Sequence, residues 1–206
     1  MNAIISQEHI PEQLQTGICI PLHKGGGKPK DEKDNFRKIT LLTIFCKIFE
    51  GLTLQRSDPY LLEGDKLGSL QGAAQPKSSS LHTTYLLQEV IQYTSGKKQT
   101  VYVSFLDARK AFDCVWTNGL FFKLYKLGID AKLWRILRKW YSNFTCKVRI
   151  GSSLSDAFNI CQGVFQGGKW SMRLFQIYYH DIIDAILKCN IGSNLYTLRT
   201  PCPTYA

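Results

Sequence analysis

Apolar and polar positions along the chain repeat with two different periods, which predicts both strands and helices. Two-residue alternation or short apolar runs predict strands over 16–24, 36–42, 144–151 and 157–163. Helical spacing of apolar residues predicts helices over 43–56, 81–96, 117–127, 131–141 and 168–188, and residues 57–80 are rich enough in Ser, Gly, Pro and Lys to predict a loop. Because the strands and helices do not alternate regularly, the pattern predicts an α+β fold and no repeated βαβ unit.

The most strand-like run is Thr-Val-Tyr-Val-Ser-Phe-Leu-Asp at 100–107. Val101, Val103 and Phe105 would lie on one face, and the opposite face is also largely apolar. A strand that is apolar on both faces is typical of the middle of a sheet that is covered on both sides. The run therefore predicts a central, buried strand that ends at Asp107.

Local signals fix the ends of several helices. Thr43 is suited to cap a helix in which Ile44, Ile48 and Leu52 lie at helical spacing. The sequence Leu-Gly-Ile-Asp at 127–130 combines a glycine that stops one helix with an aspartate that caps the next.

The charge balance narrows the class of partner. The 206 residues are 44% hydrophobic, enough for one compact domain or one and a half, and 12% aromatic. Lys and Arg number 26 against 16 Asp and Glu, which gives a net charge of +10 and a pI near 9.3. Such a surplus predicts a polyanionic partner, above all nucleic acid, although a basic surface also serves solubility alone.

Other classes of protein are disfavoured by what the sequence lacks. No stretch approaches the roughly 18 apolar residues of a membrane span, and the first residues have no features of a secretory signal. The seven cysteines include no Cys-x-x-Cys pair, and no histidine lies at ligand spacing from them, which favours free thiols over a zinc site. We therefore expect an intracellular protein without a membrane segment.

Asp107 is the main candidate for chemistry. A carboxylate that leaves an apolar strand is well placed to hold a divalent cation at the edge of a sheet, because Mg²⁺ prefers oxygen ligands. Alternatively, Asp107 caps the turn that follows it.

Four segments, in this order, resemble the reverse transcriptases of non-LTR retrotransposons. They are the basic turn and Asn-Phe-Arg-Lys-Ile-Thr-Leu within 20–50, Ser-Phe-Leu-Asp-Ala-Arg-Lys-Ala-Phe-Asp-Cys-Val at 104–115, Gly-Val-Phe-Gln-Gly within 161–183, and the helix behind it. The resemblance runs from about residue 17 to residue 206. It implies the fingers and an incomplete palm of a right-hand polymerase without its thumb, divided into fingers at 1–97 and 119–155 and palm at 98–118 and 156–206.

The resemblance assigns a metal role and a selective ring. Asp107 would bind two Mg²⁺ or Mn²⁺ ions of a phosphoryl-transfer site, with a backbone carbonyl of Leu106 or Ala108 helping to hold the second ion. Phe112 would lie beneath the sugar of the incoming nucleotide, where a ring excludes a 2′-hydroxyl and so favours DNA synthesis. The alternative for Phe112 is an ordinary core side chain.

Further roles concern the nucleotide and the template. Lys24 and Arg37 would contact the triphosphate, Gln166 would lie beside the nascent base pair, and Gly167 would permit a close approach of template and nucleotide. Basic residues on the helices at 117–141 would either follow a template backbone or form a solvated face, namely Lys123, Lys126, Arg135, Arg138 and Lys139. We expect Asp107, Phe112, Gln166, Lys24 and Arg37 to face one cleft. The 168–188 helix is expected to pack beneath the sheet.

Departures from the family's pattern limit these expectations. Phe165 stands where the family usually has Arg, and Ser171-Met172 stands where it has Ser-Pro. The sequence ends in Pro-Thr-Tyr-Ala, just where the family continues with the Asp-Asp pair that completes the metal site. We therefore expect these 206 residues alone not to extend a primer.

Three interpretations remain open on the sequence. The first is the reverse transcriptase domain of a retrotransposon, whose partners are an RNA template, a DNA primer and deoxynucleoside triphosphates. The second is a decayed or domesticated module that binds nucleic acid by charge without catalysis. The third is an RNA-templated RNA polymerase, or an intron-encoded or telomere-extending relative; Phe112 favours the first interpretation over this one.

Overall fold

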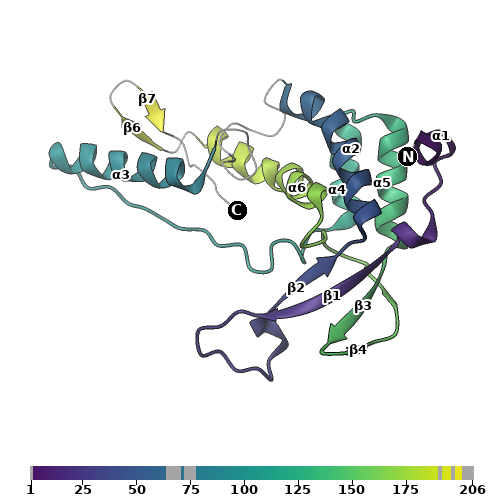
Figure 1. The fold of residues 1–206 in the computed structure, drawn as a ribbon. Helices are drawn as coiled ribbons and strands as arrows, with labels where there is room; N and C mark the ends of the chain where they lie inside the picture. Colours follow the sequence, from purple (N-terminus) through teal and green to yellow (C-terminus); the bar gives the residue numbers. More distant parts are fainter. Residues whose placement is uncertain (1, 64–70, 72–77, 190–191, 196–197, 201–206) are drawn as a thin grey trace. The chain divides into compact units, whose positions relative to one another are not determined.

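The computed structural model describes residues 2–63, 71, 78–189, 192–195 and 198–200 (Figure 1). These residues form two compact units. The first comprises Met1–Tyr60 and Lys110–Phe175, and the second comprises Leu61–Arg109 and Gln176–Ala206. Strands and helices occur together in an irregular order, so the predicted α+β class is confirmed.

A five-stranded mixed sheet is the centre of the first unit. Its strands are β1 (Thr16–His23), β2 (Phe36–Leu41), β3 (Thr145–Ile150), β4 (Ser153–Leu154) and β5 (Phe158–Asn159). The order is β2-β1-β3-β4, with β5 also paired to β3. β1 pairs with β2 in antiparallel register and with β3 in parallel register. The strands predicted at 16–24, 36–42 and 144–151 are confirmed, and the one predicted over 157–163 is reduced to β5.

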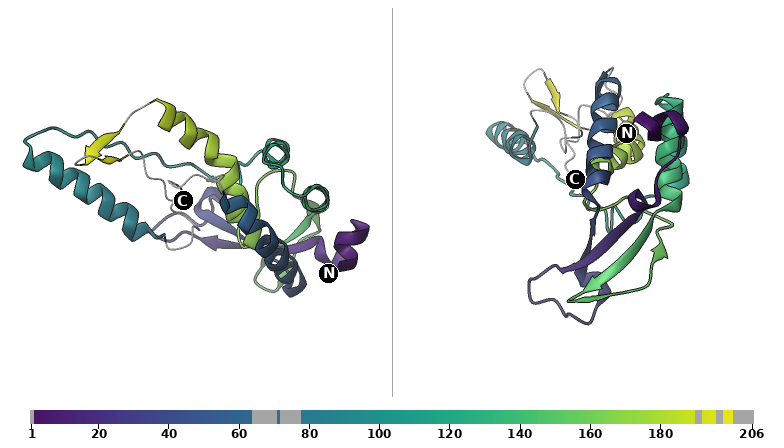
Figure 2. Two further views of the ribbon diagram at one scale, coloured as in Figure 1. Left: turned by 90° about the horizontal axis from the view of Figure 1, so that it is seen from above. Right: turned by 45° about the vertical axis from the view of Figure 1, so that its right-hand side comes forward.

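The basic turn joins the two strands of the β1–β2 hairpin (Figure 2). The ladder begins at the pair His23 and Phe36, and the N–H of Lys24 donates to the carbonyl of Asn35 (2.8 Å). Gly25, Gly26 and Gly27 follow with φ angles of +72°, +69° and +70°. Residues other than glycine rarely adopt this left-handed conformation, so the run of three glycines is what allows the chain to turn here.

Helices of the first unit lie at one end of the sheet (Figure 1). They are α1 (Asn2–Gln7), α2 (Ile44–Leu62), α4 (Thr117–Lys126), α5 (Ala131–Asn143) and the first turns of α6 (Lys169–Lys188). The predicted caps are confirmed, because the side chain of Thr43 accepts from the N–H of Cys46 (3.2 Å) and that of Asp130 accepts from the N–H of Leu133 (2.9 Å). α2 continues through Pro59 to Leu62, so the predicted loop begins later than residue 57.

An aromatic cluster fills the space between these helices and the sheet. Trp140, on α5, is fully buried, and its indole N–H donates to the carbonyl of Leu14 (2.6 Å). The ring of Phe144 lies where a Cβ on Gly17 of β1 would be only 2.9 Å away. The sheet and the aromatic cluster thus approach each other as closely as a glycine permits. The other buried rings of the cluster are Phe49, Phe121, Tyr141 and Phe165.

The second unit is built around a helix and a short hairpin. α3 (Ser80–Gly96) contacts β6 (Ser193–Leu195), which pairs with β7 (Leu198–Thr200). The side chain of Gln71 donates to the carbonyl of Gln176 on α6 (3.0 Å). α3 begins and ends where the sequence predicts. No helix within the described residues is apolar over enough of its length to cross a bilayer.

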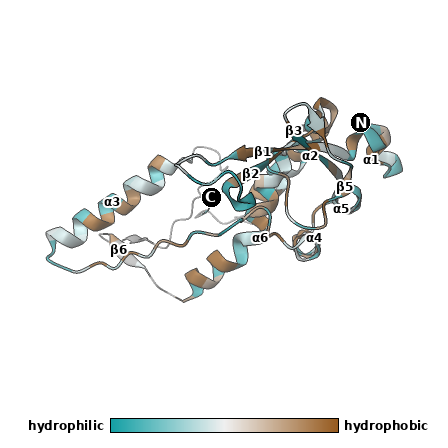
Figure 3. Ribbon diagram, turned by 90° about the horizontal axis from the view of Figure 1, so that it is seen from below, coloured by the Kyte–Doolittle hydropathy of each residue, from teal (hydrophilic) through white to brown (hydrophobic). Residues whose placement is uncertain are grey.

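The central strand predicted at 100–107 is wrong. Residues 101–108 have no regular secondary structure (Figure 3). Tyr102, Phe105 and Leu106 in this segment are 93%, 81% and 73% exposed. A strand needs a neighbour that accepts from its N–H groups and donates to its carbonyls, and no strand of the described residues pairs with this segment. The predicted packing of the 168–188 helix beneath that strand therefore has no counterpart, and the first turns of α6 pack on α2 instead.

The residue ranges of the two compact units do not coincide with those of the predicted fingers and palm. Residues 110–118 and 156–175, which were expected in the palm, pack in one unit with residues 1–60. Compactness describes packing alone, so the assignment of segments to fingers and palm stays a prediction.

The cap at Asp130 gives a test of the fold. Asp130→Ala should lower the free energy of unfolding by about 1 kcal/mol, because it removes the acceptor for the N–H of Leu133. Asp130→Asn is the matched control, since an asparagine side chain keeps the capping oxygen. Urea unfolding followed by tryptophan fluorescence measures both, and an equal loss in the two variants would contradict the cap.

Candidate nucleotide-binding site

The segment 163–168, Gly-Val-Phe-Gln-Gly-Gly, forms a tight turn that several elements hold by its backbone. The N–H of Val164 donates to the carbonyl of Phe112 (2.9 Å), and the N–H of Gly168 donates to the carbonyl of Phe165 (3.1 Å). From β2, the N–H of Thr40 donates to the carbonyl of Gln166 (2.7 Å). The turn, the Phe112 segment and β2 are therefore joined at one place.

Gly167 is required where the turn meets β2. Its φ angle is +128°, and a Cβ here would lie 2.5 Å from the carbonyl oxygen of Thr40. A side chain at this position would therefore clash with backbone, which cannot move aside without breaking the β2 contact. The proposed approach of template and nucleotide to Gly167 stays a prediction.

Phe165 anchors the turn in the core. It is 2% exposed, stacks on Tyr141 with ring centroids 4.5 Å apart and an interplanar angle of 9°, and lies 4.3 Å from Phe144. Gln166, the next residue, is half-buried. The position at which the resemblance expects an arginine is thus occupied by a ring that fills an aromatic cluster.

Phe112 lies against the first turns of α6. Its ring stacks on Phe175 with centroids 5.0 Å apart and an interplanar angle of 17°. The side chain is half-buried, so part of the ring is covered by protein and part is not. The structure therefore brings two of the expected nucleotide contacts, Phe112 and the Gln166 turn, to the same region of the first unit.

The basic residues of the hairpin lie at different distances from this region. Lys38 reaches Asp113, with its Nζ 3.8 Å from the carboxylate. Arg37 is exposed on the opposite face of β2 and lies three residues from Thr40, roughly 10 Å along the strand. Lys24 lies at the far end of the hairpin, where its Nζ donates to the carbonyl of Asp34 (2.7 Å). Sequence reasoning missed Lys38, although strand alternation places it on the same face as Thr40.

Asp107 belongs to the second unit. Its side chain is exposed, as are its neighbours Leu106 and Ala108. Within the described residues, no group of three or more His, Cys, Asp or Glu side chains could hold a metal ion. The metal role of Asp107 and its convergence with Phe112 and Gln166 therefore stay predictions.

The basic residues of α4 and α5 make contacts of their own. Arg135 donates through Nε to Glu8 (2.7 Å), and this hydrogen bond lowers the pKa of the Glu8 carboxyl. The guanidinium of Arg138 lies 5.1 Å from the ring of Trp134, and the ammonium of Lys126 lies 5.5 Å from that of Phe122. Lys139 is exposed on the same face of α5, and Lys123 lies on α4. Their role in binding phosphates stays a prediction.

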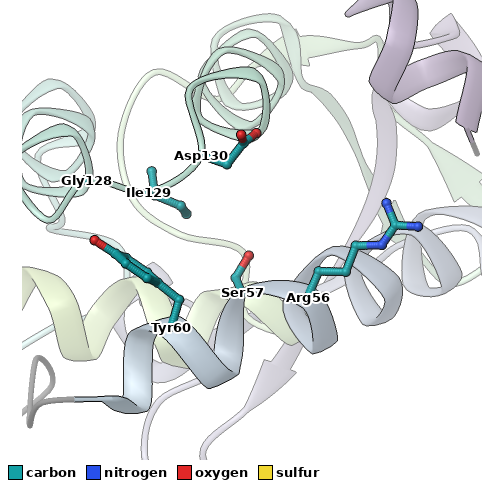
Figure 4. Close-up of a pocket in the computed structure, with 6 residues that line it drawn as sticks. All are labelled: Arg56, Ser57, Tyr60, Gly128, Ile129 and Asp130. Atoms are coloured by element: carbon teal, nitrogen blue, oxygen red, sulfur yellow. The ribbon is translucent and has the colours of Figure 1, made fainter.

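A pocket of about 350 Å³ lies between the C-terminal part of α2 and the loop that joins α4 to α5 (Figure 4). Arg56, Ser57 and Tyr60 line it from α2, and Gly128, Ile129 and Asp130 line it from the loop. The hydroxyl of Tyr60 donates to the carbonyl of Leu127 across this contact. The pocket contains none of the residues expected to bind a nucleotide.

Glu50 is the residue of this region that sequence reasoning missed. It is 0% exposed, and its two carboxylate oxygens accept from the N–H groups of Lys169 (2.9 Å) and Trp170 (3.3 Å) at the start of α6. One turn further along α2, the hydroxyl of Thr53 accepts from the indole N–H of Trp170 (2.9 Å). No local sequence pattern indicates its burial, because the N–H groups that it binds belong to residues 119 and 120 positions later.

Burial raises the pKa of the Glu50 carboxyl above its ordinary value. The two N–H groups and the ammonium groups of Lys169 and Lys47 act in the opposite direction, since they favour the charged form. Burial likewise raises the pKa of the Tyr141 hydroxyl, with the charge of Glu50 as a smaller cause. The Glu50 carboxyl and the Tyr141 hydroxyl therefore both bind their protons more tightly in the folded chain than in the unfolded chain.

Comparison with known proteins decides the family. Residues 26–199 match the family described as reverse transcriptase (RNA-dependent DNA polymerase). The chain belongs to this family. Among curated relatives, it is 30% identical over 205 residues to a probable RNA-directed DNA polymerase from transposon X-element of Drosophila melanogaster, covering 99% of this chain and 22% of that protein.

Other relatives are of the same kind. The chain is 27% identical to a probable RNA-directed DNA polymerase from transposon BS of Drosophila melanogaster, and 25% identical to a Pol polyprotein from the type-1 retrotransposable element R2 of Popillia japonica. These matches cover 88% and 86% of the chain but 20% and 25% of the relatives. The chain thus spans about a fifth to a quarter of the length of such relatives, as a reverse transcriptase domain of the non-LTR type.

A solved structure supports the polymerase fold. The apo telomerase of Candida tropicalis, truncated from its C-terminal domain, superposes with a TM-score of 0.57 at 16% sequence identity. The match covers 91% of this chain and 43% of the telomerase chain. At this identity the likeness concerns the fold alone.

Gly167→Ala tests the backbone contact of the reverse transcriptase's glycine turn. It should lower the free energy of unfolding by at least about 2 kcal/mol, because the new Cβ meets the Thr40 carbonyl at a strained φ angle. Gly26→Ala is the control, since that position also has a positive φ angle but no atom within 4 Å of the added Cβ, and should cost about 1 kcal/mol. Equal losses in urea unfolding would show that the Thr40 contact is unimportant.

The pKa of Glu50 predicts a dependence of stability on pH. Because the pKa is raised from 4.5, the folded chain binds the proton more tightly than the unfolded chain. The stability that the protonated Glu50 carboxyl contributes is fully present below about pH 4.5 and is lost as the pH rises through the pKa of Glu50 in the folded state. The free energy of unfolding of the wild type relative to Glu50→Gln, measured by urea unfolding between pH 4 and 8, should therefore fall with rising pH. A difference that is constant or rises with pH would contradict the raised pKa.

Proposed function

We propose that the protein to which these 206 residues belong is an RNA-directed DNA polymerase of a non-LTR retrotransposon. It would use an RNA template, a DNA primer and deoxynucleoside triphosphates, in the nucleus or the cytoplasm. Membership of the reverse transcriptase family supports this proposal, as does the likeness to the transposon polymerases over nearly the whole chain.

The observation that carries the proposal is that the Gln166 turn is hydrogen-bonded both to the Phe112 segment and to β2. A ring, a half-buried amide and a lysine lie together in one unit, because Val164 binds the Phe112 carbonyl and Thr40 binds the Gln166 carbonyl. The side chain of Gln166 is half-buried on a turn whose backbone is held by the Phe112 segment and by β2. A polar side chain held by a rigid turn suits the recognition of a base or a sugar.

Each of these residues would have a separate task. Phe112 would exclude a ribose 2′-hydroxyl, Gln166 would contact the nascent base pair, and Gly167 would let the strand approach the turn. Lys24 and Arg37 would contact the triphosphate oxygens through charge-assisted hydrogen bonds. Lys38 is added to this set, because its Nζ lies 3.8 Å from the carboxylate of Asp113, the residue that follows Phe112.

Mg²⁺ or Mn²⁺ is the proposed metal, with Asp107 as its ligand from this chain. Two-ion nucleotidyl transfer needs further carboxylates, and the 206 residues contain no Asp-Asp pair. The metal site is therefore proposed for the whole protein. What these residues contribute themselves is the positioning of the nucleotide and the template.

Primer extension tests the proposal directly. The 206 residues alone should not extend a primer, because they supply one metal carboxylate. A chimera that restores an Asp-Asp pair and the downstream thumb from an intact relative should extend a DNA primer on an RNA template. Asp107→Asn in the chimera should lower the rate at least about 1000-fold, since the amide keeps the size but loses the charge that holds the cations.

Asp156→Asn is the matched control in the same chimera. Asp156 is an exposed carboxylate in the loop between β4 and β5, and its change should leave the rate within about twofold. Extension by the unmodified 206 residues would overturn the proposed set of metal ligands. An active Asp107→Asn chimera would overturn the role of Asp107.

A further inference from the structure

Glu50 is a buried carboxylate that caps a helix from a different element. Its side chain comes from α2, is 0% exposed, and binds the N–H groups of Lys169 and Trp170 at 2.9 and 3.3 Å. The first N–H groups of a helix have no acceptor within that helix, and the positive end of the helix dipole favours a negative charge there. The start of α6 is therefore fixed by Glu50.

The same carboxylate also touches the glycine turn. A Cβ on Gly168 would lie 2.8 Å from Glu50 Oε1 and 2.8 Å from the hydroxyl of Ser171. The N–H of Gly168 closes the turn on the carbonyl of Phe165 (3.1 Å). Glu50 thus lies against the end of the turn, two residues after Gln166, in a space too small for a side chain at position 168.

Gln166 lies between fixed points on both sides. Before it, Phe165 is locked in the aromatic cluster, and at Gln166 itself the carbonyl accepts from the N–H of Thr40 (2.7 Å). After it, Gly168 and the start of α6 are held by Glu50. The direction of the Gln166 side chain therefore depends on contacts at both ends of the turn.

We propose that Glu50 is a positioning residue for nucleotide recognition, which fixes the turn 163–168 by capping α6 and so directs the side chain of Gln166. The inference rests on the proposed function, because that function assigns Gln166 to the nucleotide. Glu50 is fully buried and acts through the backbone, without touching a substrate.

Thr53 provides a comparison that separates positioning from stability. Its hydroxyl accepts from the indole N–H of Trp170 (2.9 Å), so it joins the same two helices. Its other hydrogen bonds go to the carbonyls of Phe49 and Glu50 on its own helix. Thr53→Val removes these bonds at similar volume and should destabilise the α2–α6 contact while leaving the turn in place.

Hydrogen exchange of the 206-residue chain gives the first test. In Glu50→Gln an amide NH₂ faces one of the two N–H donors, so one of the capping bonds is lost. The amides of Trp170 and Thr40 should then exchange at least about tenfold faster, relative to the amide of Ile136 in α5 as a reporter of global unfolding. In Thr53→Val the exchange rate of the Thr40 amide should change by the same factor as that of the Ile136 amide. Unchanged exchange at Thr40 in Glu50→Gln would overturn the inference.

Steady-state kinetics of the primer-extending chimera give the second test. Glu50→Gln should raise the KM for deoxynucleoside triphosphates about tenfold and change kcat by less than about threefold, because it disturbs binding and leaves the metal ligand in place. Thr53→Val should leave the KM unchanged. An inactive wild-type chimera would count against the proposed function alone. An active chimera whose Glu50→Gln variant keeps the wild-type KM would overturn the role of Glu50.

Discussion

A buried carboxylate at the start of a helix is the contact on which the candidate site depends. An isolated charge in a protein interior is unfavourable by several kcal/mol, and it is tolerated where N–H donors and an opposite charge surround it. Glu50 meets that condition with the N–H groups of Lys169 and Trp170, and Lys169 supplies the positive charge. Thr53, three residues further along α2, accepts a hydrogen bond from the indole N–H of Trp170. The carboxylate of Asp58 accepts one from Nε of the nearly buried Arg173 (2.9 Å). α2 and α6 are thus joined by a row of polar contacts.

This polar row explains where the sequence pattern of α2 is misleading. The apolar spacing of Ile44, Ile48 and Leu52 predicts the helix correctly, yet these side chains are 70%, 46% and 42% exposed. The buried face carries Glu50 and Thr53 instead. Periodicity reveals that the two faces of a helix differ, whereas the face that is buried depends on partners elsewhere in the chain. For Glu50 the partners lie 119 and 120 residues away, which no local pattern contains.

The same distinction between local and distant partners separates the correct predictions from the wrong one. Thr43 and Asp130 were predictable as caps because each binds an N–H group three residues away. The strands β1 and β3 were predictable individually, but their parallel pairing joins Gly17 to Cys146, which the alternation of residues cannot show. The segment 100–107 has the alternation of a strand and lacks a pairing partner in the described residues, so its strand is absent.

The Gly-Val-Phe-Gln-Gly-Gly turn shows why a short motif can be read from sequence while its mechanism cannot. Residues of the turn contact different partners. Val164 is hydrogen-bonded to Phe112, and Phe165 packs on the rings of Tyr141 and Phe144. Gly168 lies close to the carboxylate of Glu50. Gln166 is committed through its carbonyl to Thr40, which leaves its amide as the group that the turn presents. A residue inserted or enlarged here would disturb several contacts together. The motif can therefore be recognised from local spacing, whereas the carboxylate that caps the helix directly after it comes from Glu50, more than a hundred residues earlier.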